Sequence, residues 1–236
     1  MRIIKREEVA SFHQQLGSKS TEEILKWAYA ELGQDLGMTT AFGYSGILLM
    51  HLLQELAIDI DVYFVDTGFH FEETLELADR VRKEMGVRLH RVAADPELRS
   101  YFLRRYGERP YEGDANICCH YLKTTPIVEI LGKKSAWLSA LRKDQSNSRA
   151  GIDVVEMDGR GTLKIYPLAK WTREETWSYV VKRGLPYNPL HDRGFPSVGC
   201  RPCTLPVEQG GDERDGRWKS TPKLECGIHL PVISGE

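Results

Sequence analysis

This sequence of 236 residues contains five cysteines, whose type and spacing suggest chemical roles. Cys118 and Cys119 are adjacent, Cys200 and Cys203 form a Cys-Arg-Pro-Cys motif, and Cys226 stands alone near the end of the chain. An odd number of cysteines cannot all pair within one chain, and in a reducing compartment a disulfide framework is disfavoured. We therefore interpret the two pairs as ligands and Cys226 as a reagent.

The two cysteine pairs indicate a metal centre. Cys-x-x-Cys alone occurs in zinc knuckles, redox pairs and clusters. Adjacent cysteines are unusual for zinc because neighbouring thiolates rarely reach two corners of one tetrahedron, whereas the irons of a cubane cluster lie further apart. Two buried cysteines beside an unrelated zinc knuckle are the alternative. Lys123 follows Cys119 by about one helical turn and could direct its ammonium toward a cluster or a ligand.

Cys226 lies in a polar segment that contains glycine, which is not typical of a packed core. A thiolate that attacks an anionic centre needs nearby cations, which lower the pKa of the thiol and stabilise the departing charge. The alternative is an incidental exposed thiol.

Composition excludes several classes of protein. The formal net charge of −2 gives no general attraction to nucleic acid or to an anionic membrane, so an anion site must be built locally. The first five residues carry one short apolar pair between charges, and no later run is long enough to span a bilayer. We expect a cytoplasmic protein with neither a nucleic-acid nor a membrane partner.

Apolar runs alternate with amphipathic stretches along the first part of the chain. Two capping boxes, Ser20 with Glu23 and Thr172 with Glu175, mark helix starts. Strands are expected at 38–42, 61–65, 87–93, 136–141 and 163–166. Helices are expected at 20–33, 47–56, 71–85, 97–106, 121–131 and 172–184. This alternation predicts an α/β fold, a mainly parallel sheet with helices on both faces.

Ligands of such sheets bind beyond the carboxyl ends of the strands, so the loops after Phe42, Val65 and Leu141 should surround one crevice. From Pro186 onward the composition shifts toward Gly, Pro and charge. We expect a nucleotide- and cluster-binding domain over 1–210 and a flexible C-terminal tail over 211–236 that carries Cys226. Mobility suits a residue that must visit two partners in turn.

A set of collinear motifs between residues 40 and 230 resembles those of the assimilatory adenylyl-sulfate reductases. These are relatives of the phosphoadenylyl-sulfate reductases in the adenine-nucleotide α-hydrolase-like fold. The motifs are Val65-Asp66-Thr67-Gly68, Cys118-Cys119 with Lys123, Leu141-Arg142-Lys143-Asp144-Gln145-Ser146, Tyr166-Pro167-Leu168, Trp171, Pro186-Tyr187-Asn188-Pro189-Leu190, Gly199-Cys200-Arg201-Pro202-Cys203, Glu213-Arg214-Asp215-Gly216-Arg217-Trp218 and Glu225-Cys226-Gly227-Ile228-His229.

The resemblance implies a cofactor and a reaction. Cys118, Cys119, Cys200 and Cys203 would hold a [4Fe–4S] cluster, a pattern that the family associates with adenylyl sulfate. Cys226 would be the nucleophile, forming an S-sulfocysteine and releasing AMP. Thioredoxin or a glutaredoxin-like donor would then free sulfite, within sulfate assimilation and cysteine biosynthesis.

The resemblance also suggests an anion pocket. Arg214 and Arg217 match residues that contact the phosphosulfate, although a mixed-charge stretch is more often a solvated loop. Lys123 and His229 would add positive charge. Arg142, and more weakly Arg149, are placed near the crevice by the strand assignment.

Two loops are assigned to the nucleotide. Asp66, Thr67 and Gly68 follow a buried strand and should approach the nucleoside, unless they form a plain turn. The segment 42–46 lacks the Ser-Gly-Gly-x-Asp-Ser loop of ATP-using relatives, which argues against pyrophosphate chemistry and leaves the phosphate contacts of Ser45 open.

Three alternatives remain at this level. The chain could prefer the 3′-phosphorylated nucleotide, or accept both nucleotides. It could instead be a zinc-stabilised nucleotide-binding or RNA-modifying protein in which Cys226 is idle. A homo-oligomer is compatible with the sequence.

Overall fold

The computed structural model describes residues 2–208, 210–219, 221, 223 and 225–228. One sheet of six strands organises these residues, in the order β3-β2-β1-β4-β6-β5. All neighbouring strands pair in parallel except β5 and β6, which are antiparallel. The strands are β1 Leu36–Thr40, β2 Asp61–Val65, β3 Leu89–Val92, β4 Ala136–Ser139, β5 Val155–Met157 and β6 Leu163–Ile165. The predicted α/β class with a mainly parallel sheet is confirmed.

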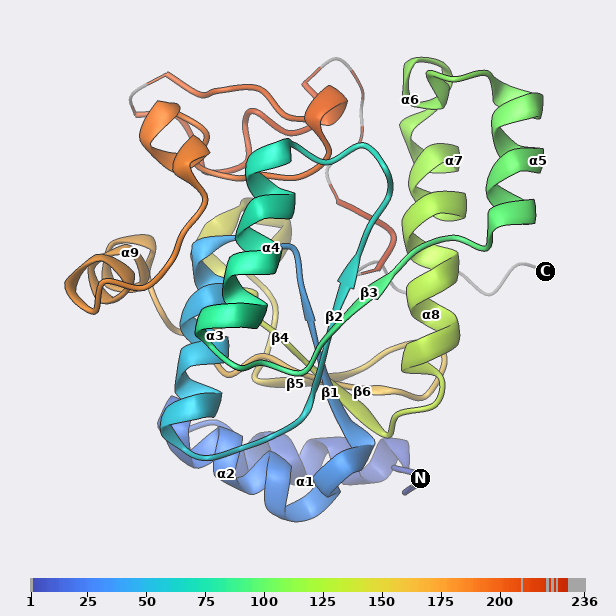
Figure 1. Ribbon diagram of the computed structural model, residues 1–236. Helices are drawn as coiled ribbons and strands as arrows, with labels where there is room; N and C mark the ends of the chain where they lie inside the picture. The colour runs from blue at the N-terminus through green and yellow to red at the C-terminus, as the bar shows by residue number, and fades with distance from the viewer. Residues whose placement is uncertain (1, 209, 220, 222, 224, 229–236) are drawn as a thin grey trace.

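Helices cover both faces of the sheet, with α3 and α4 on one side and α7 and α8 on the other (Figure 1). The helices are α1 Arg6–Leu16, α2 Thr21–Leu32, α3 Tyr44–Glu55, α4 Glu72–Glu84, α5 Pro96–Tyr106, α6 Pro110–Gly113, α7 Ala115–Cys119, α8 Thr125–Leu131 and α9 Arg173–Lys182. Both predicted capping boxes form, at Ser20 and at Thr172. Among the described residues, no helix is both long and apolar enough to cross a membrane.

The main core lies between the sheet and helices α2 to α4. Helix α3 is buried on nearly every side, as its uniformly apolar sequence predicts. The central strand β1 is also buried through Leu36 and Met38. This packing fixes the amino end of α3 directly after the carboxyl end of β1, which is where ligands of parallel sheets bind.

The segment beyond residue 210 packs against the rest of the fold in its described part. Trp218, Cys226 and Ile228 are buried in one cluster with Val65 of β2 and Trp137 of β4. The predicted boundary at residue 210 therefore does not separate these residues from the core. The mobility that the sequence predicts for this segment stays a prediction.

Candidate active site

A deep pocket opens beyond the carboxyl ends of β1 and β4, the edge of the sheet predicted to bind a ligand. Its walls come from the start of α3, the loop after β4, and the segments near Gly199, Arg217 and Cys226. The charged and titratable side chains that line it are His70, Lys123, Arg149, His191, Cys200, Glu213, Arg214, Arg217 and Cys226. Four of these carry a permanent positive charge, so the pocket suits an anionic ligand.

The amino end of α3 forms one wall of the pocket. Gly43 is its N-cap residue and supplies no side-chain cap, so the first amides of the helix remain available to a ligand. Gly46 packs so closely that a Cβ there would lie 2.7 Å from Thr40 Oγ1. The free amides and the helix dipole together favour an anion at this position.

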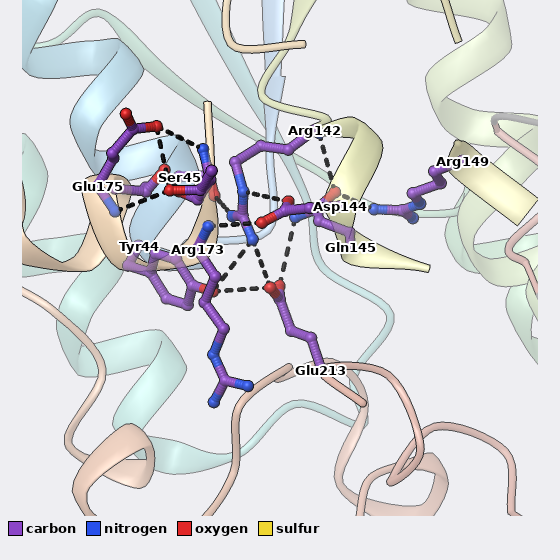
Figure 2. A network of polar contacts seen from close by, with 11 residues as sticks. Tyr44, Ser45, Arg142, Asp144, Gln145, Arg149, Arg173, Glu175 and Glu213 are labelled. Atoms are coloured by element: carbon purple, nitrogen blue, oxygen red, sulfur yellow. Dashed lines mark hydrogen bonds and ion pairs between the residues drawn. The ribbon is translucent and has the colours of Figure 1, made fainter. Parts of the chain in front are cut away.

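A buried polar network supports this wall (Figure 2). Arg142 is fully buried, and its guanidinium lies 2.5 Å from Glu213 and 2.9 Å from Asp144. It also donates to Ser45 Oγ at 2.5 Å, while Tyr44 donates to Glu213 at 2.8 Å. The network joins the start of α3, the loop after β4 and the segment that carries Arg214.

Cys226 lines the pocket and is 6% exposed. Burial would raise the pKa of its thiol, and Glu225 acts in the same direction. The positive charges of Lys123, Arg149 and Arg214 outweigh both, so the net pKa of Cys226 is lowered. A lowered pKa increases the fraction of nucleophilic thiolate.

Two arginines beside Cys226 share one carboxylate. Arg149 binds both oxygens of Glu225, at 2.7 and 2.8 Å, and Arg214 binds one of them at 3.1 Å. Burial and the neighbouring charge of Arg149 lower the pKa of Arg214 to about 10, against the opposing effect of Glu225. The guanidinium remains charged at neutral pH.

Arg217 lies over the aromatic ring of Trp218. Its guanidinium carbon is 4.5 Å from the ring centroid of Trp218, and Arg214 and Lys223 lie 5.5 and 5.4 Å from the same ring. Gly199 makes room for this arrangement, because a Cβ there would lie 2.2 Å from Arg217 Nη2. Stacking fixes the fork of Arg217, which is the geometry needed to bind an oxyanion.

A second, smaller cavity is lined by Cys118, Cys119, Cys200 and Cys203. Cys118 and Cys119 end α7 and precede a π-helical turn, His120–Thr124, which carries Lys123. Cys203 N donates to Cys200 O at 3.0 Å across a tight turn, which keeps that pair together. All four thiols are free.

Thiols that line this cavity have raised pKa values. Burial and the neighbouring cysteines raise the pKa of Cys118 to about 12 and that of Cys203 to about 11, so a metal would have to displace their protons. In the described part of the chain, no three His, Cys, Asp or Glu side chains converge in a way that could hold a metal ion.

The two cavities share a wall. Lys123, Cys200, Arg217 and Trp218 border both of them. Positive charge therefore lies between the cysteine cavity and Cys226.

Known proteins with similar sequences match this chain over nearly their whole length. The sequence model of the phosphoadenosine phosphosulfate reductase domain matches residues 35–206. Proteins of Bacillus cereus and Bacillus mycoides, both named adenosine 5′-phosphosulfate reductase, are each 40% identical to the chain. The alignment with the Bacillus cereus protein covers 93% of this chain and 94% of that protein. The alignment with the Bacillus mycoides protein covers 95% of this chain and 97% of that protein. The chain belongs to the phosphoadenosine phosphosulfate reductase family.

Solved structures agree with this membership. A phosphoadenylyl-sulfate reductase from Candida auris, solved as a phosphate complex, matches with a TM-score of 0.74 and 27% identity, covering 86% of this chain and 98% of that one. An FMN adenylyltransferase from Candida glabrata shares the fold alone, at 13% identity and a TM-score of 0.58 over 92% of this chain and 81% of its own. As a member of the reductase family, the chain is an oxidoreductase.

Some residues assigned to the substrate from sequence have other contacts in this family member. Arg142 does not line the pocket, because its donors are used by Glu213, Asp144 and Ser45. These contacts make Arg142 a support for the pocket wall, and its role in substrate binding stays a prediction. Ser45 itself does line the pocket.

The loop after β2 also differs from the expectation. Asp66 forms an ion pair with Arg91 and accepts from Gly68 N at 2.8 Å, while Thr67 Oγ1 lies 3.1 Å from Cys200 Sγ in the cysteine cavity. Neither these residues nor Gly68 line the large pocket. These contacts fit the alternative of a plain strand-ending turn, and the approach of this loop to the nucleoside stays a prediction. His229 lies outside the described residues.

The residues at the site that were not predicted include His70 and Glu213, which line the pocket, and Glu225, which binds Arg149 and Arg214 beside it. His70 Nε2 donates to Val65 O at 2.9 Å, and its buried Nδ1 has no hydrogen-bond partner among the described residues. Glu213 and Glu225 belong to recognised motifs, but their acidic side chains gave no signal of an ion pair with distant arginines.

Proposed function

We propose that this protein reduces adenylyl sulfate to sulfite and AMP, with Cys226 as the nucleophile and a protein dithiol as the reductant. The observation that carries the proposal is the position of Cys226 in the pocket, beside Lys123, Arg149 and Arg214. The names of the 40% identical relatives support the substrate class. Thioredoxin or a glutaredoxin-like protein supplies the dithiol.

The nucleotide and sulfate ends of the substrate have complementary surfaces in the pocket. The amino end of α3 with Ser45 offers amides and a hydroxyl to a phosphate. Arg214 and Arg217 offer guanidinium forks to the sulfonate oxygens. This orientation directs the sulfur atom toward Cys226.

In the first step the Cys226 thiolate attacks the sulfur of the sulfonate. A bond forms between the two sulfur atoms as the bond from sulfur to the bridging oxygen breaks, and AMP leaves with that electron pair. Cys226 then carries an S-sulfo group. Lys123 and the arginines stabilise the negative charge that develops on the leaving phosphate.

In the second step a donor thiolate attacks Cys226 Sγ and displaces sulfite, which gives a mixed disulfide. The second donor thiol then displaces the Cys226 thiolate and closes the donor disulfide. The dithiol thus supplies the two electrons that reduce the sulfur, and Cys226 is regenerated.

The cysteine cavity would hold a [4Fe–4S] cluster through Cys118, Cys119, Cys200 and Cys203. When bound, the cluster would supply a redox-capable, charged centre beside the wall that the two cavities share. Lys123 and Arg217 lie in that wall and would face both the cluster ligands and the substrate.

The charges in the pocket favour the substrate without a 3′-phosphate. Lys143 is exposed and does not line the pocket, and Arg142 is paired with the buried carboxylate of Glu213. The cations that do line it are assigned to the sulfate end or paired with Glu225. A 3′-phosphate would therefore be desolvated without compensation.

Sulfite release measured with each nucleotide and a dithiol donor tests this function. We expect kcat/KM to be higher for adenylyl sulfate by about tenfold or more, the cost of one unpaired polar group. Lys143→Ala should leave both values unchanged. Equal or better turnover of the 3′-phosphorylated substrate, lost in Lys143→Ala, would reverse the substrate assignment.

A further inference from the structure

Glu225 directly precedes Cys226. Its carboxylate is held by the side chains of Ser148, Arg149 and Arg214. Its carboxylate accepts from Arg149 at 2.7 and 2.8 Å, from Arg214 at 3.1 Å and from Ser148 Oγ at 3.2 Å. The carboxylate side chain is only 10% exposed. Bidentate, charge-assisted bonds of this kind are the strongest that a carboxylate makes.

The arginines that hold Glu225 are also walls of the substrate pocket. Two nitrogens of Arg149 bind Glu225, and its third donates to Gln145 Oε1 at 2.5 Å. An oxyanion that approaches Arg149 in the same bidentate geometry must replace Glu225. The protein's own carboxylate and the anionic end of a ligand therefore draw on the same donors.

Because Glu225 is adjacent to Cys226, competition for Arg149 and Arg214 also affects how the nucleophile is held. Cys226 is the next residue and is 6% exposed, so the clasp formed by Glu225, Arg149 and Arg214 holds the nucleophile inside the fold. Breaking the clasp frees the backbone next to the thiol. A protein dithiol requires such release, because a sulfur atom this buried cannot be reached by a second protein.

We propose that Glu225 is a positioning residue for Cys226, an internal anion that holds the nucleophile in the empty pocket and exchanges with the anionic end of the substrate for Arg149 and Arg214. The identity of that anion rests on the proposed function. The clasp itself is a property of the ligand-free protein. Ligand binding and the exposure of Cys226 are thereby linked through one carboxylate.

Glu225→Gln tests the clasp because it removes the charge and keeps the size. Site-resolved alkylation of Cys226 by iodoacetamide should accelerate about fivefold or more in the ligand-free protein, as expected when a local contact that limits opening is removed. The comparison uses the alkaline plateau of each rate profile, where the thiol is fully ionised, so that a changed thiol pKa does not contribute. Glu208→Gln, an exposed carboxylate of a nearby loop, is the matched control and should match wild type.

Ligand affinity gives the second readout, and it separates competition from a merely structural role. Inorganic sulfate, titrated by calorimetry, should bind Glu225→Gln about three- to tenfold more tightly than wild type, because the competing carboxylate is gone. A residue that only maintained the fold would weaken binding when replaced. Weaker or unchanged affinity for sulfate would overturn the proposal.

A double-mutant cycle tests whether Arg149 and Glu225 act through the same contact. Its second single variant also provides a test if Glu225→Gln folds poorly. Arg149→Gln and Glu225→Gln should each accelerate alkylation, and the double variant should be little faster than either, since both break the same clasp. Independent, multiplying effects would contradict a shared contact. None of these measurements uses adenylyl sulfate or sulfite release, so a failure of the proposed reaction is recognised separately, by the absence of sulfite from wild type.

Discussion

The guanidinium of Arg142 lies 2.5 Å from the carboxylate of Glu213, a residue 71 positions further along the chain, and both side chains are buried. This contact fastens the segment that carries Arg214 and Arg217 to the loop after β4. This ion pair therefore helps to hold Arg214 and Arg217 in the pocket lining, although Arg142 itself does not line the pocket.

Replacing either partner of this pair should destabilise the fold. Arg142→Ala leaves Glu213 as an uncompensated buried charge, so we expect the free energy of unfolding to fall by about 3–5 kcal/mol in urea titrations. Removing the exposed helix pair of Arg80 and Glu84 should cost far less, because solvent screens an exposed pair. If removing either pair lowered the free energy of unfolding by a similar amount, the buried pair would contribute no more to stability than an exposed one.

The four paired cysteines should behave differently from Cys226. Serine at position 118, 119, 200 or 203 should remove iron and visible absorption and lower the yield of folded protein, because ligation contributes to folding. Cys226→Ser should retain both iron and colour. Zinc in place of iron in wild type, or full iron in all four variants, would refute the cluster assignment.

Arg214 and Arg217 should contribute to binding of the sulfate end. Alanine at either position should weaken binding of adenylyl sulfate by about 1.5–3 kcal/mol, the value of a charge-assisted hydrogen bond. Arg104→Ala, on the exposed face of α5, is the control. If the double variant bound substrate and AMP as wild type does, the segment 213–217 would return to the interpretation as a solvated loop.

The rate of S-sulfo formation should depend on pH through Cys226. Burial and Glu225 raise the pKa of this thiol, but Lys123, Arg149 and Arg214 lower it further, so the rate should rise and level off below the usual thiol range. Lys123→Met removes a cation and should move the midpoint of that rise to higher pH. Lys219→Met changes an exposed lysine and should leave the midpoint in place. A downward shift in Lys123→Met would contradict the electrostatic account.

Much of the sheet follows from local sequence, because β1, β2, β4 and β6 are short apolar runs between turn residues. The short strand β5 was missed, since its Val-Glu-Met sequence alternates too briefly to give a period. Helix α1 was also missed because its sequence is largely polar. Spacing alone was enough to group the cysteines with Lys123, which one π-helical turn places beside them.

The contacts of the acidic residues could not be predicted in the same way. Glu213 and Glu225 stand in mixed-charge segments that read as solvated loops, and their partners Arg142 and Arg149 lie 71 and 76 residues away. Only the folded chain shows that the strand order brings these segments together. Because Glu213 is so far from Arg142 in sequence, the ion pair that holds Arg142 behind the pocket wall could not be predicted.

The central claim is that Cys226 attacks the sulfur of adenylyl sulfate, and peptide-resolved mass spectrometry tests it most directly. Wild-type protein is mixed with adenylyl sulfate in the absence of any dithiol, and the modified peptide and released AMP are quantified together. We predict one S-sulfo group on Cys226 for each AMP released, lost again with release of sulfite when the dithiol is added. AMP release without the adduct, or an adduct on a different cysteine, would contradict the account.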